Sequence, residues 1–280
     1  MKLLIHGGFF SESSQSNETK IAKQQAMERI ARESFAFLQT HSAVETVTFA
    51  VSLLENDPLF NAGTGSQIQS DGIIRMSASL MDGHTHRFSG VINIEQVQNP
   101  IFVAEHLQKV DDRVLGGEGA IRYAEQAQFQ KFSTETPERR AEYEAKLTAS
   151  RLGTVGCVTL DKDGKLAAAT STGGKGFEIP GRISDSATVA GNYADGNAAV
   201  SCTGVGEDIV SAGLACKIVT RVADGMSLEA AFGRTFGEMS AYDGFAGAIG
   251  LDANGNWFWQ ESHPKIVFAA YDGTTLKTFE

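Results

Sequence analysis

The segment 152–160, LGTVGCVTL, follows a long charged stretch and begins the part of the chain in which strands dominate. VGCVTL is a short apolar run, and a DKDG turn and the run KLAAAT follow it. Two such runs around a glycine-containing turn are typical of a β-hairpin. The segment therefore predicts a buried hairpin with Gly153 and Thr154 at its entrance. The question is whether Thr154 only begins the strand or becomes a new terminus after cleavage in front of it.

The rest of the chain predicts strands and helices around this hairpin. Further strands are expected at 2–6, in NAAVSCTG, in a second hairpin AIGLDANGNWFWQ, and on each side of the Ser-Asp-Gly turn at 70–72. Apolar residues at helical spacing predict helices at 20–38, with Thr19 as N-cap, at 44–54, from Pro100, at 207–222 and at 227–239. Hairpins that alternate with helices, without a run of βαβ units, are typical of an α+β fold.

The segment before the hairpin, STETPERRAEYEAKLTAS at 133–150, has a different composition. It is rich in charged residues and shows little apolar periodicity, which is typical of a solvated helix or a linker. We expect it to be exposed and open to cleavage near its end.

The bulk composition limits the classes of partner. The chain has 280 residues, of which 42% are hydrophobic and 21% charged, as in ordinary globular proteins. A net charge of −10 and the lack of a long basic run argue against nucleic acid and anionic membranes as partners. The three cysteines are scattered without a CxxC pair, and the N-terminal apolar run is too short for a signal peptide. We therefore expect a cytoplasmic protein without a membrane span.

Three familiar site signatures are incomplete. The glycines of Thr203-Gly-Val-Gly-Glu-Asp precede a predicted helix, but Ile209 stands at the third glycine position of a dinucleotide loop. The pair His84-Thr-His86 has only Asp82 nearby, which is a poor ligand set for a catalytic metal. A GxSxG nucleophile elbow is absent. The two glycines would still present backbone N–H groups that suit an oxyanion or a carboxylate at a helix N-terminus.

Thr154 is a candidate nucleophile only if the chain is cut in front of it. A threonine hydroxyl is almost un-ionised at neutral pH and needs a base within hydrogen-bond reach, and a peptide nitrogen cannot serve as one. A free α-amine, with a pKa of about 8 in free peptides, can do so. Cleavage after Gly153 would give Thr154 both groups, and Gly153 lacks the Cβ that would oppose the strained backbone of an N-to-O acyl shift. From this spacing alone, an ordinary strand start is the more common interpretation.

Blocks on both sides of Thr154 resemble the plant-type L-asparaginase and isoaspartyl peptidase family of N-terminal nucleophile hydrolases. The later blocks are GTVGCVTLDKDGKLAAATSTGG, PGRISDSATVAGNYAD and AVSCTGVGE, and the earlier ones are HGG, PLFNAGTGS, ASLMDG, QNPI and LGGEGAIRYAE. They stand in the family's order over nearly the whole chain. The resemblance implies a single domain, 1–280, with the family's four-layer αββα sandwich. It also implies autocleavage into 1–153, an α subunit that ends in an exposed linker at about 133–153, and 154–280, the β subunit.

The resemblance implies the catalytic roles. Thr154 is similar to the family's nucleophile, exposed by cleavage after Gly153, and Thr172 to the threonine that orients the nucleophile and its amine. Thr203 and Gly204 resemble the oxyanion hole, in which a hydroxyl and a backbone N–H meet the developing negative charge. The freed amine would take the hydroxyl proton, the oxygen would attack the side-chain amide of an aspartyl group, and water would release aspartate from the ester. These steps would serve L-asparagine and β-aspartyl dipeptides alike.

The resemblance also implies the binding residues. Arg182 resembles the arginine that grips the substrate α-carboxylate, a task that suits a planar guanidinium. Asp185 resembles the carboxylate that holds the substrate α-ammonium, and Gly206 a glycine whose backbone contacts the same group. Asn61 is similar to an asparagine that supports the nucleophile. Without the resemblance, Arg182 and Asp185 would more commonly be a surface ion pair and Asn61 a turn residue.

The same resemblance covers cofactors and assembly. No cofactor is expected for catalysis. A structural sodium ion is implied, and its ligands would be the backbone oxygens of Leu54, Glu55, Asp57, Phe60, Ala62 and Thr64. The family implies a homodimer of αβ heterodimers. The expected partners are small substrates, namely β-aspartyl dipeptides and L-asparagine.

The sequence departs from the family pattern at several positions. HGGFF replaces the usual HGGAG, and Ser77 stands where aspartate is usual. Four further residues are unusual: His84, His86, Trp257 and Trp259. We expect these departures, together with HGGFF and Ser77, to border the leaving-group side. The preferred leaving group, ammonia or an apolar or basic second residue, therefore stays open.

Two alternative functions also stay open. One is a glycosylasparaginase-like amidase, against which the missing secretion signal argues. The other is an unprocessed, non-catalytic relative, against which the joint presence of the assigned threonines, arginine and aspartate argues.

Overall fold

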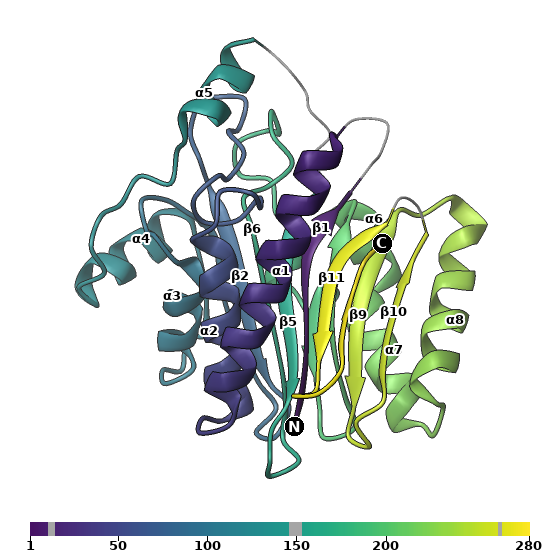
Figure 1. The fold of residues 1–280 in the computed structure, drawn as a ribbon. Coiled ribbons are helices and arrows are strands. Elements are labelled where there is room, and N and C mark those ends of the chain that lie inside the picture. The colour runs from purple at the N-terminus through teal and green to yellow at the C-terminus, as the bar shows by residue number, and fades with distance from the viewer. Residues whose placement is uncertain (11–14, 146–152, 263–264) are drawn as a thin grey trace.

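The computed structural model describes residues 1–10, 15–145, 153–262 and 265–280. These residues form a mixed α/β structure with two β-sheets, in agreement with the expected α+β class (Figure 1). The last part of the expected linker, 146–152, lies outside the described residues. None of the described helices combines the length and the apolar character that a membrane span requires.

The larger sheet is built around the hairpin that opens with Thr154. In the described residues its strands follow the order β12-β11-β1-β5-β6-β2-β3-β4, and neighbours are antiparallel except for β3 and β4. The strands are β1 (Lys2–Phe9), β2 (Met76–Asp82), β3 (Arg87–Ile94), β4 (Val114–Gly116), β5 (Thr154–Leu160), β6 (Leu166–Thr172), β11 (Ile266–Tyr271) and β12 (Leu276–Thr278). Every residue of β5 and β6 is buried, which explains their nearly continuous apolar and small side chains.

The smaller sheet contains the second predicted hairpin. Its described strands follow the order β10-β9-β8-β7, and their bounds are β7 (Asn192–Ala194), β8 (Ala198–Gly204), β9 (Ala246–Asp252) and β10 (Trp257–Glu261). Strand β8 packs against β5 and β6 of the larger sheet, so the two sheets lie face to face here. The end of β8 thereby reaches the start of β5, although the two segments lie far apart in the sequence.

Helices pack on each sheet. In contact with the larger sheet are α1 (Asn17–Leu38), α2 (Ala43–Glu55), α3 (Pro100–Leu107) and α4 (Gly117–Gln126), and in contact with the smaller sheet are α6 (Gly206–Ala212), α7 (Leu214–Ala223) and α8 (Leu228–Met239) (Figure 1). The short helix η1 (Asp185–Ala187) follows a loop, η2 (Ser240–Tyr242) directly continues from α8, and α5 (Pro137–Glu144) lies in the charged segment before Thr154.

Three sequence-based expectations for the elements are wrong. The N-cap of α1 is Ser16, whose hydroxyl accepts a hydrogen bond from the Thr19 backbone N–H, so Thr19 itself lies in the first turn. The helix expected at 207–222 is two helices, because Gly213 adopts a left-handed conformation, with φ 59° and ψ 41°, and ends α6. The apolar periodicity continues through this break, so the sequence pattern does not reveal it.

The third error concerns the segment before the Ser-Asp-Gly turn, which is not a strand. The Gln69 N–H donates to Ile73 O over 2.9 Å and closes a tight loop. The neighbouring Ile68 carbonyl accepts a hydrogen bond from Phe177 N, more than 100 residues away in the sequence. The backbone groups of this segment are thus satisfied by other loops instead of a sheet partner.

Candidate active site

Three threonines from three strands meet at one end of the sheets. Thr154 begins β5, Thr172 ends β6 opposite it, and Thr203 lies near the end of β8. Thr154 Oγ1 lies 3.3 Å from Thr172 Oγ1, and the Thr154 backbone nitrogen lies 3.4 Å from Thr203 Oγ1. All three side chains are buried. The hydroxyl and the nitrogen of Thr154 therefore each have a threonine hydroxyl as partner.

A cavity of about 130 Å³ opens at this cluster. It is lined by Gly153, Thr154, Thr172, Gly174, Lys175, Arg182, Ser184, Gly204, Val205, Gly206 and Glu207. Both residues of the expected cleavage site thus line the same cavity as Arg182. Sequence reasoning missed Lys175 and Glu207, although each adjoins a glycine of a matched block, in GGK and in GVGE.

Arg182 is held by a carboxylate at the rim of the cavity. Its Nε and Nη2 each donate to one Glu207 oxygen over 2.8 Å, and Lys175 Nζ lies 3.7 Å from the same carboxylate. The hydrogen bonds from Arg182 lower the pKa of Glu207 to about 2, so Glu207 is ionised at neutral pH. Because Glu207 takes the Nε–Nη2 edge, the Nη1–Nη2 edge of the guanidinium is left for a second carboxylate.

Asp185 is a buried carboxylate with an incomplete set of partners. It is 1% exposed, and only Oδ1 receives a hydrogen bond, from Ser184 Oγ at 2.8 Å. Oδ2 has no hydrogen-bond partner within the described part of the chain. Burial raises the pKa of Asp185 to about 6, although the Ser184 hydrogen bond and the Arg182 charge oppose the shift. A carboxylate in this state favours a cationic ligand that supplies N–H donors.

Two glycines allow the backbone to approach the site closely. Gly204 has φ 145°, and a Cβ on it would lie 2.5 Å from Phe245 O. A Cβ on Gly206 would lie 2.6 Å from Ser184 Oγ and 2.9 Å from Asp185 Oδ1. Because a side chain at either position would collide with its neighbours, both glycines of TGVG are required here for steric reasons.

Asn61 is not among the residues that line the cavity, and its side chain contacts the backbone beside the threonines instead. Its amide Nδ2 donates to Gly174 O over 2.5 Å, and its Oδ1 accepts from Gln67 N over 3.0 Å. Gly174 N in turn donates to Thr172 Oγ1 over 3.2 Å. Asn61 thus holds the backbone that contacts Thr172, and it acts on the threonine cluster through that backbone.

A buried polar chain lies beneath the threonines and was not singled out from the sequence. His6 Nε2 lies 2.8 Å from Ser201 Oγ, which lies 2.7 Å from Thr170 Oγ1. Burial lowers the pKa of His6 to about 3, so the imidazole is neutral. A Cβ on Gly156 would lie 2.0 Å from Ser201 Oγ, which explains the glycine inside GTVGCVTL.

The four unusual residues that we expected near the leaving group lie elsewhere. His84 and His86 belong to the turn after Asp82, which pairs with Ala167 at the opposite end of β6 from Thr172. Trp257 lies 4.7 Å below Lys2 Nζ, also at that opposite end, and Trp259 packs on Phe268 in mid-strand. None of the four lines the threonine cavity. The chain reverses direction at each antiparallel turn, so the turn after Asp82 and the start of β1 both lie at the end of the sheet opposite Thr172.

The expected exposed linker is also only partly correct. In its described portion, 133–145, Thr134 and Arg139 are each 4% exposed. Arg139 Nε donates to Gly65 O over 2.6 Å, and the helix α5 forms around this contact. This burial could not be predicted from apolar periodicity, because the buried side chain is an arginine whose guanidinium donates to a backbone carbonyl.

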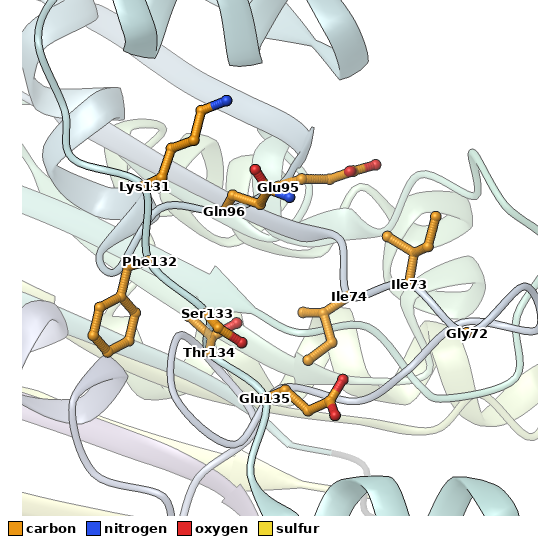
Figure 2. Close-up of a pocket in the computed structure, with 10 residues that line it drawn as sticks. All are labelled: Gly72, Ile73, Ile74, Glu95, Gln96, Lys131, Phe132, Ser133, Thr134 and Glu135. Atoms are coloured by element: carbon orange, nitrogen blue, oxygen red, sulfur yellow. The ribbon is translucent and has the colours of Figure 1, made fainter.

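A second cavity, of about 360 Å³, lies apart from the threonines between 131–135 and 72–74 (Figure 2). Its charged residues already have partners: Lys131 pairs with Glu125, Glu95 with Arg75 and Glu135 with Arg140. This cavity offers no unpaired charge to a ligand and contains none of the expected catalytic residues.

The loop expected to hold sodium folds back on the end of α2. Thr64 N donates to Glu55 O over 2.7 Å, and Phe60 N donates to Asp57 O over 3.1 Å. A carbonyl oxygen has a second lone pair, and the C-terminus of a helix favours a cation. The Glu55 and Asp57 carbonyls therefore each keep a lone pair that a sodium ion would use. In residues 1–10, 15–145, 153–262 and 265–280, no group of three or more His, Cys, Asp or Glu side chains is arranged to hold a metal.

Comparison with known proteins assigns the class. A model of the asparaginase family matches residues 1–148 and 131–280. The isoaspartyl peptidase/L-asparaginase of Nostoc sp. is 46% identical, with 98% of this chain and 93% of that protein covered. The protein of the same name from Synechocystis sp. is 43% identical (98% and 89% covered), and the isoaspartyl peptidase of Escherichia coli is 36% identical (91% and 87% covered). The chain is a hydrolase, and it belongs to the asparaginase family.

Proposed function

We propose that this protein is a self-processing β-aspartyl peptidase with L-asparaginase activity and that Thr154 is its N-terminal nucleophile. The observation that carries the proposal is the surroundings of Thr154. Its hydroxyl and its nitrogen each lie within 3.4 Å of a threonine hydroxyl, at the wall of a cavity that Arg182 also lines. The names of the related proteins support the same substrate class.

Self-processing would create the catalytic base. The Thr154 hydroxyl attacks the Gly153 carbonyl carbon, the peptide C–N bond breaks as the ester forms, and water hydrolyses the ester. This leaves chains 1–153 and 154–280, which we propose form one four-layer αββα domain of the N-terminal nucleophile type. The released nitrogen is the atom that lies 3.4 Å from Thr203 Oγ1, so the new amine already has a hydrogen-bond partner.

Hydrolysis would then follow in the mature protein. The amine takes the Thr154 hydroxyl proton, and the oxygen attacks the side-chain amide carbon of the substrate. The Thr203 hydroxyl and the Gly204 N–H stabilise the tetrahedral oxyanion. Ammonia or the amine of a second residue leaves with the proton, and water hydrolyses the aspartyl ester and restores Thr154.

Charge complementarity would select the α-amino-acid end of the substrate. The free edge of Arg182 binds the α-carboxylate, and Asp185, whose Oδ2 has no described partner, binds the α-ammonium. The carbonyl-rich loop at 54–64 supports a bound structural sodium ion. A cytoplasmic homodimer of αβ heterodimers completes the proposal, and catalysis needs no cofactor.

Mass spectrometry and product analysis together test the proposal. The purified protein should yield the masses of 1–153 and 154–280. It should release aspartate from L-asparagine and from β-Asp-Leu. A chain that stays intact on prolonged incubation and releases no aspartate from either substrate would overturn the proposal.

A further inference from the structure

Helix α5 belongs to the segment before the proposed cleavage site, yet it packs on the loop that leads to Arg182. The rings of Tyr143 and Phe177 stack with centroids 5.1 Å apart and an angle of 11° between their planes. The Tyr143 hydroxyl also donates to Ser70 O over 3.2 Å. Tyr143 thus joins α5 to the loop that contains Phe177 and to the loop that contains Ser70.

The loop at 173–182 has little regular structure to hold its shape. Three of its glycines have positive φ values between 81° and 92°, and Phe177 has φ 55°, which is unfavourable for a residue with a side chain. Its backbone is held by the loop 61–72 instead. Gly173 N donates to Asn61 O, Phe177 N to Ile68 O, and Ser70 N to Glu178 O, over 2.9 to 3.1 Å.

The loop 61–72 is in turn held by the segment before the cleavage site. Arg139 Nε donates to Gly65 O over 2.6 Å, and Gly65 N donates to Thr134 O over 3.0 Å. The stretch 131–135 lines the cavity of Figure 2. Among the contacts of this segment, the Tyr143 stack is the one that bears directly on the loop 173–182.

Glu207 alone does not determine where the Arg182 guanidinium lies. The bidentate pair with Glu207 orients the guanidinium, but the Glu207 side chain is 53% exposed and does not fix where the arginine backbone lies. Arg182 N donates to Ile179 O over 3.0 Å, so the arginine backbone follows the shape of the loop. The contacts that keep Phe177 in its unfavourable conformation therefore also fix the position of the Arg182 backbone, from which the guanidinium extends.

We propose that α5 stays docked after self-cleavage and that Tyr143 is a positioning residue for substrate binding. It acts through Phe177 and the loop 173–182 on Arg182. This inference rests on the proposed function, since it assigns Arg182 to the substrate carboxylate. It makes the end of the α subunit a part of the substrate site, although that segment contributes no group to the reaction.

Steady-state kinetics on fully cleaved protein test the role of Tyr143. Tyr143→Ala removes the ring stack, and the KM for L-asparagine should rise about 3- to 10-fold with kcat within about twofold of the parent. Tyr143→Phe keeps the stack and should restore a KM close to that of the parent. Glu144→Ala, at an exposed position of the same helix, is the matched control and should change neither constant.

Hydrogen exchange gives a readout that does not depend on activity. Amides of 173–182 should exchange faster in Tyr143→Ala than in the parent, and not in Glu144→Ala. Phe177→Leu removes the stack from the other side and should reproduce both effects if Tyr143→Ala fails to fold. An unchanged KM and unchanged exchange in these variants would overturn the role of Tyr143 while the parent stays active. An inactive parent would instead overturn the proposed function, and exchange would still decide whether α5 orders the loop.

Discussion

Two buried aspartates at opposite ends of the β5–β6 hairpin show how differently the two ends are built. Asp161 follows Leu160 at the turn end, is 4% exposed, and accepts hydrogen bonds from the backbone N–H groups of Ala43, Asp163 and Lys165. Asp185, near the threonine end, is 1% exposed and receives one hydroxyl donor on one oxygen. The carboxylate with several N–H donors tightens a turn, whereas the one with few keeps an oxygen without a described partner, as the proposed ammonium site requires.

The same contrast holds for the surrounding residues. The turn end carries exposed histidines and a lysine over Trp257, and these groups form no cavity with the threonines. The threonine end combines paired hydroxyls, glycines without room for a Cβ, and one free guanidinium edge. Substitutions at the threonine end should therefore change activity, whereas substitutions at the turn end should change only the stability of the fold.

The largest effect is expected at Thr154. Thr154→Ala removes the attacking hydroxyl from both reactions, so the chain should stay at its full-length mass and aspartate release should fall more than about 10³-fold. Thr154→Ser keeps a hydroxyl and is the matched control, with partial cleavage and activity. Cleavage at 153/154 in the alanine variant would show that another group is the nucleophile.

The second-largest effect is expected for Gly206→Ala, which adds a methyl group beside the binding residues. It would approach Ser184 Oγ, Asp185 Oδ1 and Arg182 Nη2 to between 2.6 and 3.0 Å, so the KM for L-asparagine should rise about 10-fold or more in Gly206→Ala. Gly237→Ala in α8, where a Cβ meets nothing within 4 Å, is the control. It should leave the kinetics unchanged and raise the free energy of unfolding by about 0.5–1 kcal/mol. Equal KM values for the two variants would contradict the assignment of Gly206 to the binding site.

Activity and stability should respond oppositely to the titration of Asp185. Because burial raises its pKa to about 6, kcat/KM for L-asparagine should fall as the pH drops below about 6 and the carboxylate loses its charge. The pKa in the folded state lies above that in the unfolded state. Its contribution to the free energy of unfolding is therefore fully present below about pH 4 and is lost as the pH rises through about 6.

Kinetic and thermal profiles between about pH 4 and 8 check both directions, with Asp185→Asn as the variant that lacks this titration. The difference in Tm between parent and variant should change most between about pH 4 and 6. A difference that stays constant over this range would assign the titration to another group.

Loss of sodium should act on stability more than on chemistry. The loop 54–64 closes the threonine end of α2, so exchange of NaCl for choline chloride at constant ionic strength should lower the Tm by a few degrees, about 2–5 °C. The Tm should return when sodium is restored. Identical melting curves in the two salts would remove sodium from the proposal.

The smallest effects are expected at the turn end. His84→Ala should leave kcat/KM within about twofold of the parent, because His84 is exposed and lies outside the cavity. Trp257→Ala should lower the Tm, because the ring loses its contact with Lys2, and should leave the kinetics unchanged. A large loss of activity in either variant would mean that the two ends are coupled.

Most of the strands and the long helices could be predicted from periodicity and turns. The hairpin at Thr154, the helix from Pro100 and the second predicted hairpin, β9–β10, are all present. The errors arose where a single backbone conformation or a distant polar partner decides the structure. Gly213 breaks a helix without breaking its apolar pattern, and the backbone of Ile68 bonds to Phe177 instead of a strand neighbour.

The sequence alone determined which residues are available for catalysis. It placed Thr154 after a glycine at the start of a buried strand, and the order of the blocks indicated the family. Only the tertiary structure decided how these residues meet, because β8 must pack across β5 before Thr203 can lie 3.4 Å from the Thr154 nitrogen. It also decided that Tyr143 and Arg139 contact the loops beside the site, because these contacts join segments that lie far apart in the sequence.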